Sequence, residues 1–337
     1  MAKSITIKDI AREAGVSIAL VSFVMNNRIE ANGKQKYRVS PATRDRIMEV
    51  AARMNYQPSS AARMLRKGRT HVIGVILSDM GNIFYGTIAK ELEKIATRNN
   101  YTLLFGSSEE DPERFSRLVK SFMEKDVEGF IVVPTMGSGP SMQKLMDSGI
   151  PFVVIDRYHP DYNVPTVVTD NSDATRLAVH DLQEQGARKI CMVSYAMRIS
   201  SMTDRENRFR DLLGDDAPIF TMGFSTVDAD ADKVADEIIA GGYDGVISSS
   251  NVLTVALLKS LMRRGVKVQE DVKIVSFDFS NVYGIFNPPI RYVLQPLSQI
   301  ASESAEFLFY LIEKKQKGED ISGIKDKIIL KASLKNY

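Results

Sequence analysis

The segment Thr6–Asn26, which reads TIKDIAREAGVSIALVSFVMN, constrains the chain more than any other part of its sequence. Thr6 followed by Asp9 is a capping box, which predicts the start of a short helix. Gly15 supplies a tight turn, and Ser17 can cap a second helix with apolar residues on one face. Two short helices joined in this way form the helix-turn-helix pattern, whose second helix enters the major groove of DNA.

The first seventy residues are also strongly basic. They hold 14 Lys and Arg against 5 Asp and Glu, whereas the rest of the 337-residue chain holds 30 against 37. A basic end on a mildly acidic body is typical of a phosphate-binding module joined to a regulatory one. The alternative is a solvated, charged helix surface. Because the charges coincide with the helix-turn-helix, we expect double-stranded DNA as a partner.

A third helix and a linker follow. Ser40 before a proline predicts a helix that runs to about Met54. Pro58 then breaks the chain, and a short helix over residues 61–66 is expected to end at Gly68. Six residues are too few for a stable isolated helix, so this one needs DNA or a second copy of the chain to fold.

From His71 onward, short apolar strands alternate with helices of 10–15 residues, which is typical of parallel sheets with crossover helices. Strand-like runs occupy residues 71–77, 101–105, 129–133, 151–155, 166–168, 189–194, 218–222, 244–248 and 273–277. Two such series predict two doubly wound α/β lobes behind an all-α headpiece. Ligands of such sheets bind at the carboxyl ends of the strands, so a ligand is expected between the lobes.

Other classes of protein find little support. The single cysteine, Cys191, lies in an apolar run and is expected to be a buried hydrophobe. No signal peptide and no apolar run of membrane-spanning length are present, so we expect a cytoplasmic protein without membrane contact. The three histidines show no metal spacing, and no nucleophile elbow, P-loop or GxGxxG occurs. We therefore expect neither an enzyme, nor a cofactor or metal, nor a binding protein of the transport type.

Four segments in this order resemble the lactose repressor (LacI/GalR) family of transcription regulators: TIKDIAREAGVS, NYQPSSAARML, HVIGVILSD, and VSFD followed by QP. The resemblance implies a headpiece, a hinge helix and a core folded like periplasmic sugar-binding proteins. It also implies an oligomer in which a small effector alters the geometry of two headpieces on a near-palindromic operator. Without a leucine heptad tail, a homodimer is favoured over a tetramer.

The expected boundaries follow from these segments. The headpiece covers residues 1–58, the hinge helix and linker 59–70, and the effector-binding and dimerisation core 71–337. Within the core, the N-lobe is expected at about 71–165 and 297–324, and the C-lobe at about 166–296 and 325–337.

By position in the motif, the resemblance implies two kinds of DNA contact in the headpiece. Thr6, Ser17, Ser22 and Asn26 match phosphate-contacting positions, although Thr6 and Ser17 can serve as helix caps as well. Ile18 and Ala19 match the main base-contacting positions, where apolar side chains can touch thymine methyl groups.

Phe23 departs from the family pattern, because many relatives carry arginine or histidine there. Phenylalanine cannot donate to guanine, so Phe23 either makes apolar contacts with DNA or packs into the headpiece. In the hinge, Leu65 matches the leucine that wedges into the minor groove, and Arg63 lies near phosphates in that arrangement.

For the effector, the resemblance implies Phe84 and Tyr85 at the start of a helix, with aromatic faces suited to a sugar ring or a purine. Asp278, Asn251 and Arg205 match polar positions suited to hydroxyl groups. The aromatic pair could instead be core.

The two arginines leave alternatives open. Arg205 could pair with a neighbouring carboxylate on the surface, and Arg198 competes with it for the pocket role. Arg157 could meet an anionic ligand or pair with Asp161.

We therefore expect a DNA-binding transcription regulator, a repressor of a carbohydrate-use operon whose operator affinity is changed by a sugar effector. A purine, an anionic metabolite or a partner protein as co-regulator stays open, as does activation instead of repression.

Overall fold

The computed structural model describes residues 5–25, 39–56, 69–159 and 161–337. The chain divides into two compact units, Met1–Thr70 and His71–Tyr337. The division coincides with the expected start of the core at residue 71. Three of the expected DNA-contacting residues, Asn26, Arg63 and Leu65, and the expected hinge helix lie outside the described residues.

Three helices build the first unit: α1 (Ile7–Glu13), α2 (Ile18–Met25) and α3 (Pro41–Arg53). The expected caps are present. The backbone N–H of Thr6 donates to Asp9 Oδ2 at 3.0 Å, and Leu20 N–H donates to Ser17 Oγ at 3.2 Å. Gly15 has a φ of +62°, which lets the chain turn between α1 and α2 without strain on a side chain.

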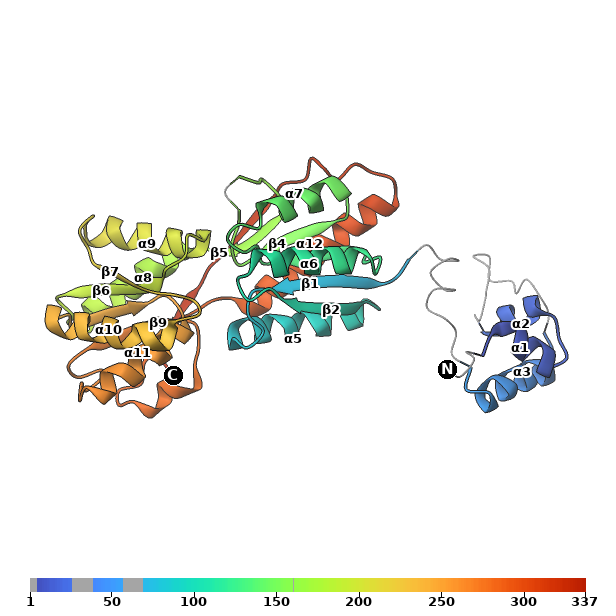
Figure 1. The fold of residues 1–337 in the computed structure, drawn as a ribbon, viewed down its shortest axis with the longest axis horizontal. Coiled ribbons are helices and arrows are strands. Elements are labelled where there is room, and N and C mark those ends of the chain that lie inside the picture. Colours follow the sequence, from blue (N-terminus) through green and yellow to red (C-terminus); the bar gives the residue numbers. More distant parts are fainter. Residues whose placement is uncertain (1–4, 26–38, 57–68, 160) are drawn as a thin grey trace. The chain divides into compact units, whose positions relative to one another are not determined.

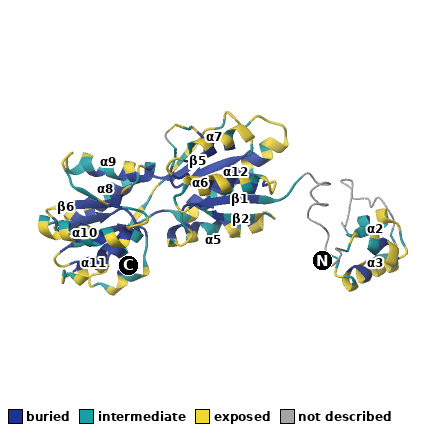
Figure 2. Ribbon diagram, viewed as in Figure 1, coloured by how far each residue is buried: buried dark blue, intermediate teal, exposed yellow. Residues whose placement is uncertain are grey.

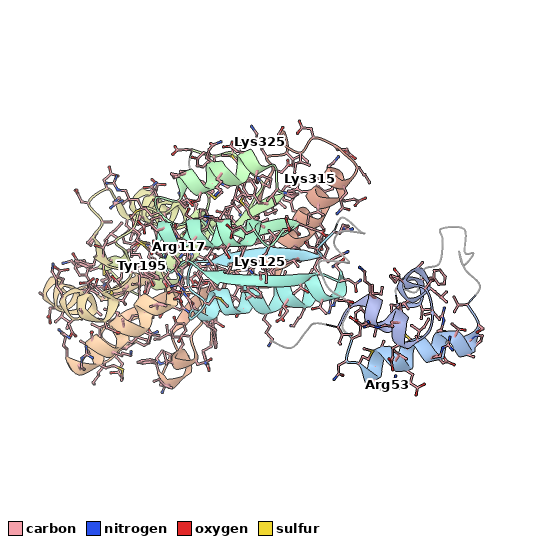
Figure 3. The ribbon with its side chains drawn as sticks, turned by 45° about the vertical axis from the view of Figure 1, so that its right-hand side comes forward. Arg53, Arg117, Lys125, Tyr195, Lys315 and Lys325 are labelled. Carbon is pink, nitrogen blue, oxygen red and sulfur yellow. The ribbon has the colours of Figure 1, made fainter. Side chains whose placement is uncertain are left out.

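One apolar cluster holds the three helices together. Its buried members are Ile10, Ala11, Ala14, Val21, Phe23, Val24, Ile47, Val50 and Ala51. On the surface, Arg53 of α3, marked in Figure 3, donates to Glu13 Oε1 at 2.7 Å. Because both side chains of this pair are more than half exposed, the apolar cluster and not the ion pair dominates the stability of the unit.

The second unit contains two six-stranded sheets with helices on both faces (Figure 1). In the first sheet, every neighbouring pair of strands is parallel, in the order β11-β5-β4-β3-β1-β2. Its strands are β1 (Val72–Leu77), β2 (Thr102–Ser107), β3 (Gly129–Val132), β4 (Phe152–Ile155), β5 (Thr166–Thr169) and β11 (Lys327–Leu330). Its helices are α5 (Ile83–Arg98), α6 (Pro112–Met123), α7 (Gly139–Ser148) and α12 (Leu297–Gln316).

Alternation along the strands divides the core of this lobe into two layers. Ile73 and Val75 of β1 pack in the cluster that includes α5 and α12. Ile76 faces the opposite way and packs in the cluster that includes α6 and α7. Since both faces are covered, the inner strands β1, β3, β4 and β5 are buried almost throughout, as Figure 2 shows by their dark colour, whereas the edge strands β2 and β11 are partly exposed.

The second sheet repeats the pattern in the order β12-β10-β9-β8-β6-β7, and only β12 runs antiparallel to its neighbour. Its strands are β6 (Ile190–Tyr195), β7 (Ile219–Met222), β8 (Gly245–Ser248), β9 (Lys273–Phe277), β10 (Arg291–Leu294) and β12 (Ser333–Lys335). Its helices are α8 (Asn171–Glu184), α9 (Ser200–Leu213), α10 (Val227–Gly241) and α11 (Asn251–Arg263). Cys191 of β6 is fully buried, as expected. In the described ranges, no helix combines the length and apolarity needed to cross a membrane.

The chain passes three times between the two sheets, and two of these passages differ from the expected lobe boundaries. The expected passage at 296/297 is found, between β10 and α12. The first passage follows β5 and not residue 165, because β5 pairs with β4 and β11 in the first sheet. The third lies between β11 and β12 and not at 324/325. Both β5 and β11 are short apolar strands. The sequence of such a strand does not indicate with which of the two sheets it pairs.

Replacing Phe23 with alanine is expected to destabilise the headpiece by about 3–5 kcal/mol, because it removes a buried ring from a small core. Hydrogen–deuterium exchange of the amides in residues 5–25 and 39–56 of the full chain measures this, and we expect faster exchange there with unchanged exchange in residues 71–337. The control is Ile18→Ala, since Ile18 is 46% exposed on the same helix. Equal exchange in the two variants would show that Phe23 does not hold the unit together.

Candidate ligand pocket and nucleic-acid interface

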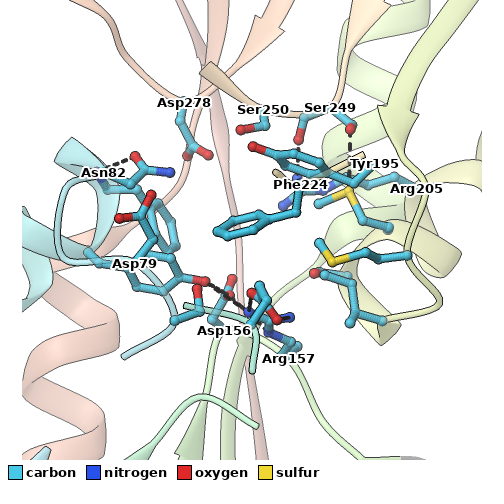
Figure 4. A pocket seen from close by; sticks show the side chains of 18 of the residues that line it. Asp79, Asn82, Asp156, Arg157, Tyr195, Arg205, Phe224, Ser249, Ser250 and Asp278 are labelled. Carbon is cyan, nitrogen blue, oxygen red and sulfur yellow. Dashed lines mark hydrogen bonds and ion pairs between the residues drawn. The ribbon is translucent and has the colours of Figure 1, made fainter. Parts of the chain in front are cut away.

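The carboxyl ends of strands from both sheets meet around one pocket, whose polar and aromatic lining Figure 4 shows. From the first lobe come Ser78, Asp79, Asn82, Phe84, Tyr85, Glu110, Asp156 and Arg157. From the second lobe and its passage back come Tyr195, Met197, Ile199, Ser201, Met202, Arg205, Phe224, Ser249, Ser250, Asp278 and Gln295. The position is the one expected for a ligand of parallel α/β sheets.

Five of the six residues expected at the effector site line this pocket: Phe84, Tyr85, Arg157, Arg205 and Asp278. All five are less than one tenth exposed. The competing candidate, Arg198, is exposed and is not among the lining residues. The pocket therefore brings together residues that are far apart in the chain and that the sequence assigned to one site.

Arg157 is held by carboxylates of its own lobe. Its guanidinium donates through both Nη atoms to Glu110, with an Nη1–Oε2 distance of 3.1 Å, and Nε lies 3.8 Å from Asp156 Oδ2. Burial alone lowers the pKa of Arg157, but Tyr85, Glu110 and Asp156 outweigh it and raise the pKa above its usual value. Arg157 does not pair with Asp161, which was the alternative that the sequence left open.

Tyr85 is tied into the same group. Its hydroxyl donates to Asp156 Oδ2 at 2.7 Å and accepts from Arg157 Nη2 at 3.4 Å. Burial and the neighbouring Asp156 raise the pKa of Tyr85 well above its usual value, so the hydroxyl keeps its proton. The ring packs edge-on against Phe84, with centroids 4.8 Å apart. The two aromatic residues therefore belong to the lobe's core and to the pocket wall together.

Arg205 is also satisfied within its own lobe. Its Nε donates to Asn171 Oδ1 at 2.8 Å and its Nη1 to the carbonyl of Ser249 at 2.6 Å. The guanidinium carbon lies 4.0 Å from the centroid of Phe277. Burial lowers the pKa of Arg205, against the opposing effect of Asp278. The expected alternative, a surface pair with Asp204 or Glu206, is wrong.

Asp278 occupies the residue after β9 in a left-handed conformation, with a φ of +64°. Gln295 Nε2 donates to its two carboxylate oxygens at 3.0 and 3.2 Å. Burial raises the pKa of Asp278 to about 7, although Arg205 and the Gln295 hydrogen bond work against it. The other amide atom, Gln295 Oε1, is buried without a hydrogen-bond partner, so it offers an acceptor to a ligand.

Asn251 is the expected site residue that does not line the pocket. Its Nδ2 donates to Asn82 Oδ1 at 3.1 Å and to the carbonyl of Phe279 at 3.2 Å. Since Asn82 caps α5 of the first lobe, Asn251 links the two lobes beside the pocket. A second link involves Tyr158, whose N–H donates to Ser200 Oγ at 2.8 Å and whose hydroxyl donates to Asp204 Oδ1 at 3.2 Å.

Several lining residues were not expected from the sequence, notably Asp79, Glu110, Tyr195 and Phe224. Asp79 and Glu110 follow β1 and β2, and Tyr195 ends β6. A search of every residue just past a strand end would have found Asp79, but Glu110 lies in an acidic loop that resembles any exposed loop.

Phe224 follows β7 and points into the middle of the pocket in Figure 4, with its ring centroid 6.0 Å from that of Tyr195. It also borders a second, outer groove of about 860 Å³. The inner pocket has a volume of about 60 Å³.

On the headpiece, the starts of α1 and α2 present the expected DNA-contacting side chains. Thr6, Ser17, Ile18 and Ala19 are exposed, and Ser22 is half-buried. The Ser17 hydroxyl accepts from a backbone N–H and keeps its own proton to donate, so capping and phosphate contact are compatible.

Phe23 is not on this surface. It is 4% exposed and packs in the headpiece core, which corrects its assignment as a DNA-contacting residue. The alternative of packing was the right one, because α2 turns this position toward α1 and α3.

The pKa of Asp278 leads to a dependence of stability on pH. Between pH 4 and pH 7 the Asp278 carboxyl is ionised in the unfolded chain but still protonated in the folded chain. The free energy of unfolding of the wild type therefore falls as the pH rises through this window. Above pH 7, Asp278 causes no further change. An asparagine side chain at this position cannot titrate. The melting temperature of Asp278→Asn relative to wild type is therefore expected to rise from pH 4 to pH 7 and to level off above. A constant difference from pH 4 to pH 8 would contradict the raised pKa.

Comparison with known proteins agrees with both units. The model for bacterial regulatory proteins of the lacI family matches residues 6–59, and the periplasmic binding protein domain matches residues 73–284. The structure of the lac repressor dimer bound to operator and the anti-inducer ONPF has the same fold, with a TM-score of 0.81 and 18% identity over 98% of each chain.

Two relatives match nearly the whole chain. The catabolite control protein A of Staphylococcus epidermidis is 30% identical over 310 residues, which are 90% of this chain and 92% of the relative. The ribose operon repressor of Bacillus subtilis is 30% identical over 320 residues, which are 93% and 94% of the two chains. The chain therefore belongs to the lacI family of bacterial regulatory proteins.

Proposed function

We propose that the protein is a sequence-specific DNA-binding repressor of a carbohydrate-use operon, and that a sugar bound between the two lobes changes its operator affinity. The observation that carries the proposal is the combination of parts in one chain. A helix-turn-helix unit with an exposed recognition-helix start is joined to a separate α/β unit whose two lobes enclose a polar pocket.

On the DNA side, Ile18 and Ala19 contact the edges of the bases directly. Both are exposed at the start of α2, where the side chains reach the floor of the major groove. Apolar side chains recognise thymine methyl groups and make no bidentate hydrogen bonds, so specificity also rests on DNA shape. Thr6 and Ser17 position the helix on the phosphates, with Ser22 beside them.

On the ligand side, the pocket combines aromatic faces with hydrogen-bonding groups. Phe84 and Phe224 offer apolar surface to the C–H face of a sugar ring. Asp278, Gln295 and Arg205 offer acceptors and donors for hydroxyl groups. A ribose operon repressor among the relatives supports a small sugar as the ligand.

Coupling follows from where the ligand sits. A ligand in contact with Tyr85 of one lobe and Asp278 of the other bridges both, so it favours one angle between the lobes over another. The change in the free energy of operator binding can be no larger than the difference in the free energy of ligand binding between the two arrangements. By the same linkage, operator binding changes the affinity for the ligand.

The test begins with selection of an operator from random duplexes by the purified protein. Fluorescence anisotropy of the selected duplex is then followed during titration with pentoses, hexoses and disaccharides. Release of the operator by a sugar is the expected result. Selection of no preferred sequence would overturn the DNA-reading role, and a preferred sequence unaffected by any carbohydrate would overturn the sugar effector.

Asp278→Ala is expected to abolish release of the operator by the sugar, because the variant loses a buried acceptor in the pocket, while operator affinity without sugar is retained. Anisotropy titrations with and without sugar measure both. The matched control, Asp215→Ala, removes an exposed carboxylate of the same lobe and should respond as wild type does. An unchanged response in Asp278→Ala would remove this residue from the site.

Leu65→Ala is expected to weaken specific operator binding by far more than non-specific binding, because a minor-groove wedge contributes only where the duplex is kinked. The proposal rests on the family position of Leu65 in the sequence. Titrations against the selected operator and a scrambled duplex at one salt concentration measure the ratio. Equal losses on the two duplexes would exclude the wedge.

A further inference from the structure

The charges around the pocket show which class of sugar it takes, and this reasoning rests on the function proposed above. Four carboxylates line the pocket, those of Asp79, Glu110, Asp156 and Asp278. Two guanidinium groups face them, and each of the two arginines is 2% exposed. A ligand that enters is therefore surrounded by more acidic than basic groups at low dielectric, where charges interact strongly.

Arg157, the cation that could recognise an anion, already has a carboxylate on both Nη atoms; only its Nε is without a hydrogen-bond partner, and it lies 3.8 Å from Asp156 Oδ2. Glu110 accepts from both of its Nη atoms, and the two side chains are 3% and 8% exposed. Nη2 is also within 3.4 Å of the Tyr85 hydroxyl. A phosphate or carboxylate would have to displace Glu110 from a bidentate pair in a buried site, and would leave that carboxylate buried without a partner.

Arg205 is also partly engaged, and carboxylates surround it. Two of its N–H groups are taken by Asn171 and by the Ser249 carbonyl. Its charge is opposed by Asp278 and Asp156, which work to raise its pKa. The remaining donors suit a hydroxyl oxygen, which brings no charge into the pocket.

We propose that the pocket selects an uncharged polyhydroxylated ligand of monosaccharide size and excludes its phosphorylated and carboxylated forms, and that Glu110 enforces this selection by occupying the guanidinium of Arg157. Hydroxyl groups donate to the carboxylates and accept from the arginines, so a neutral sugar satisfies both kinds of group. Glu110 is a specificity-determining residue in this account, and it acts through Arg157.

The first test uses the wild-type full chain and matched pairs of probes. Melting temperature and operator release are measured with D-ribose and D-ribose 5-phosphate, and with D-glucose and D-glucose 6-phosphate. In any pair that acts on the protein, the neutral sugar is expected to bind at least about tenfold more tightly, a difference of about 1.4 kcal/mol. A phosphorylated sugar that binds as tightly as its neutral partner would overturn the proposal. Tighter binding of the cationic D-glucosamine than of D-glucose would contradict selection for an uncharged ligand.

The second test uses inorganic phosphate at pH 7.5 and does not depend on the identity of the effector. Glu110→Gln removes one carboxylate and releases Arg157, so phosphate is expected to raise the melting temperature of this variant. The gain should vanish in Glu110→Gln/Arg157→Met. Any phosphate effect that persists in the double variant arises outside the pocket and is subtracted.

Glu113→Gln is the matched control, because it makes the same change of charge at a side chain of α6 that is 86% exposed. It should respond to phosphate as wild type does. A phosphate response in wild type that Arg157→Met removes would overturn the proposal, and so would a Glu110→Gln variant that gains no response. If Glu110→Gln does not fold, as judged by circular dichroism, Glu110→Asp replaces it, since the shorter side chain keeps the charge and weakens the bidentate pair.

The two proposals fail in different ways. If the variants respond to phosphate as expected but no sugar releases the operator, the sugar effector is refuted and the exclusion of anions is retained. Operator release by sugar phosphates would refute the exclusion and leave a carbohydrate-responsive repressor.

Discussion

Three passages of the chain between the lobes determine how the core can work. They follow β5, β10 and β11, at the carboxyl ends of strands, and the pocket lies at the same ends. Gln295, in the second passage, holds Asp278 directly. Lys331 lies in the third passage, and its Nζ donates to Oδ2 of Asp170, in the first passage, at 3.1 Å. Any rotation of one lobe against the other would take place about these passages, and the pocket lies next to them.

Each lobe supplies the hydrogen-bond partners of its own buried arginine. Arg157 is paired with Glu110 and Asp156 of the first lobe, and Arg205 with Asn171 and Ser249 of the second. Between the lobes, Asn251 donates to a neutral oxygen, and Tyr158 donates through its N–H to Ser200 and through its hydroxyl to the carboxylate of Asp204. Separation of the lobes would break these hydrogen bonds and would leave both buried arginines with the partners of their own lobe, which is what a domain pair with two accessible arrangements requires.

The sequence predicted the alternation of strands and helices, the caps at Thr6 and Ser17, and five of the nineteen residues that line the pocket, because these features are local or lie at strand ends. Pairing of distant strands was beyond it, so β5 and β11 were placed in the wrong lobe. Phe23 shows a similar limit, since an apolar residue on a three-helix headpiece fits the core and the DNA surface equally well in one dimension. Glu110 became a candidate only when the fold brought it to Arg157.

Phe224 has a consequence for the size of molecule that the protein can accept. Its ring borders the inner pocket on one side and the larger outer groove on the other. It therefore acts as a partition, and a molecule seated against Asp278 and Tyr85 meets an aromatic wall where the space would otherwise continue. The length of molecule that fits is limited on this side by a single side chain in a loop, outside the strands of both sheets.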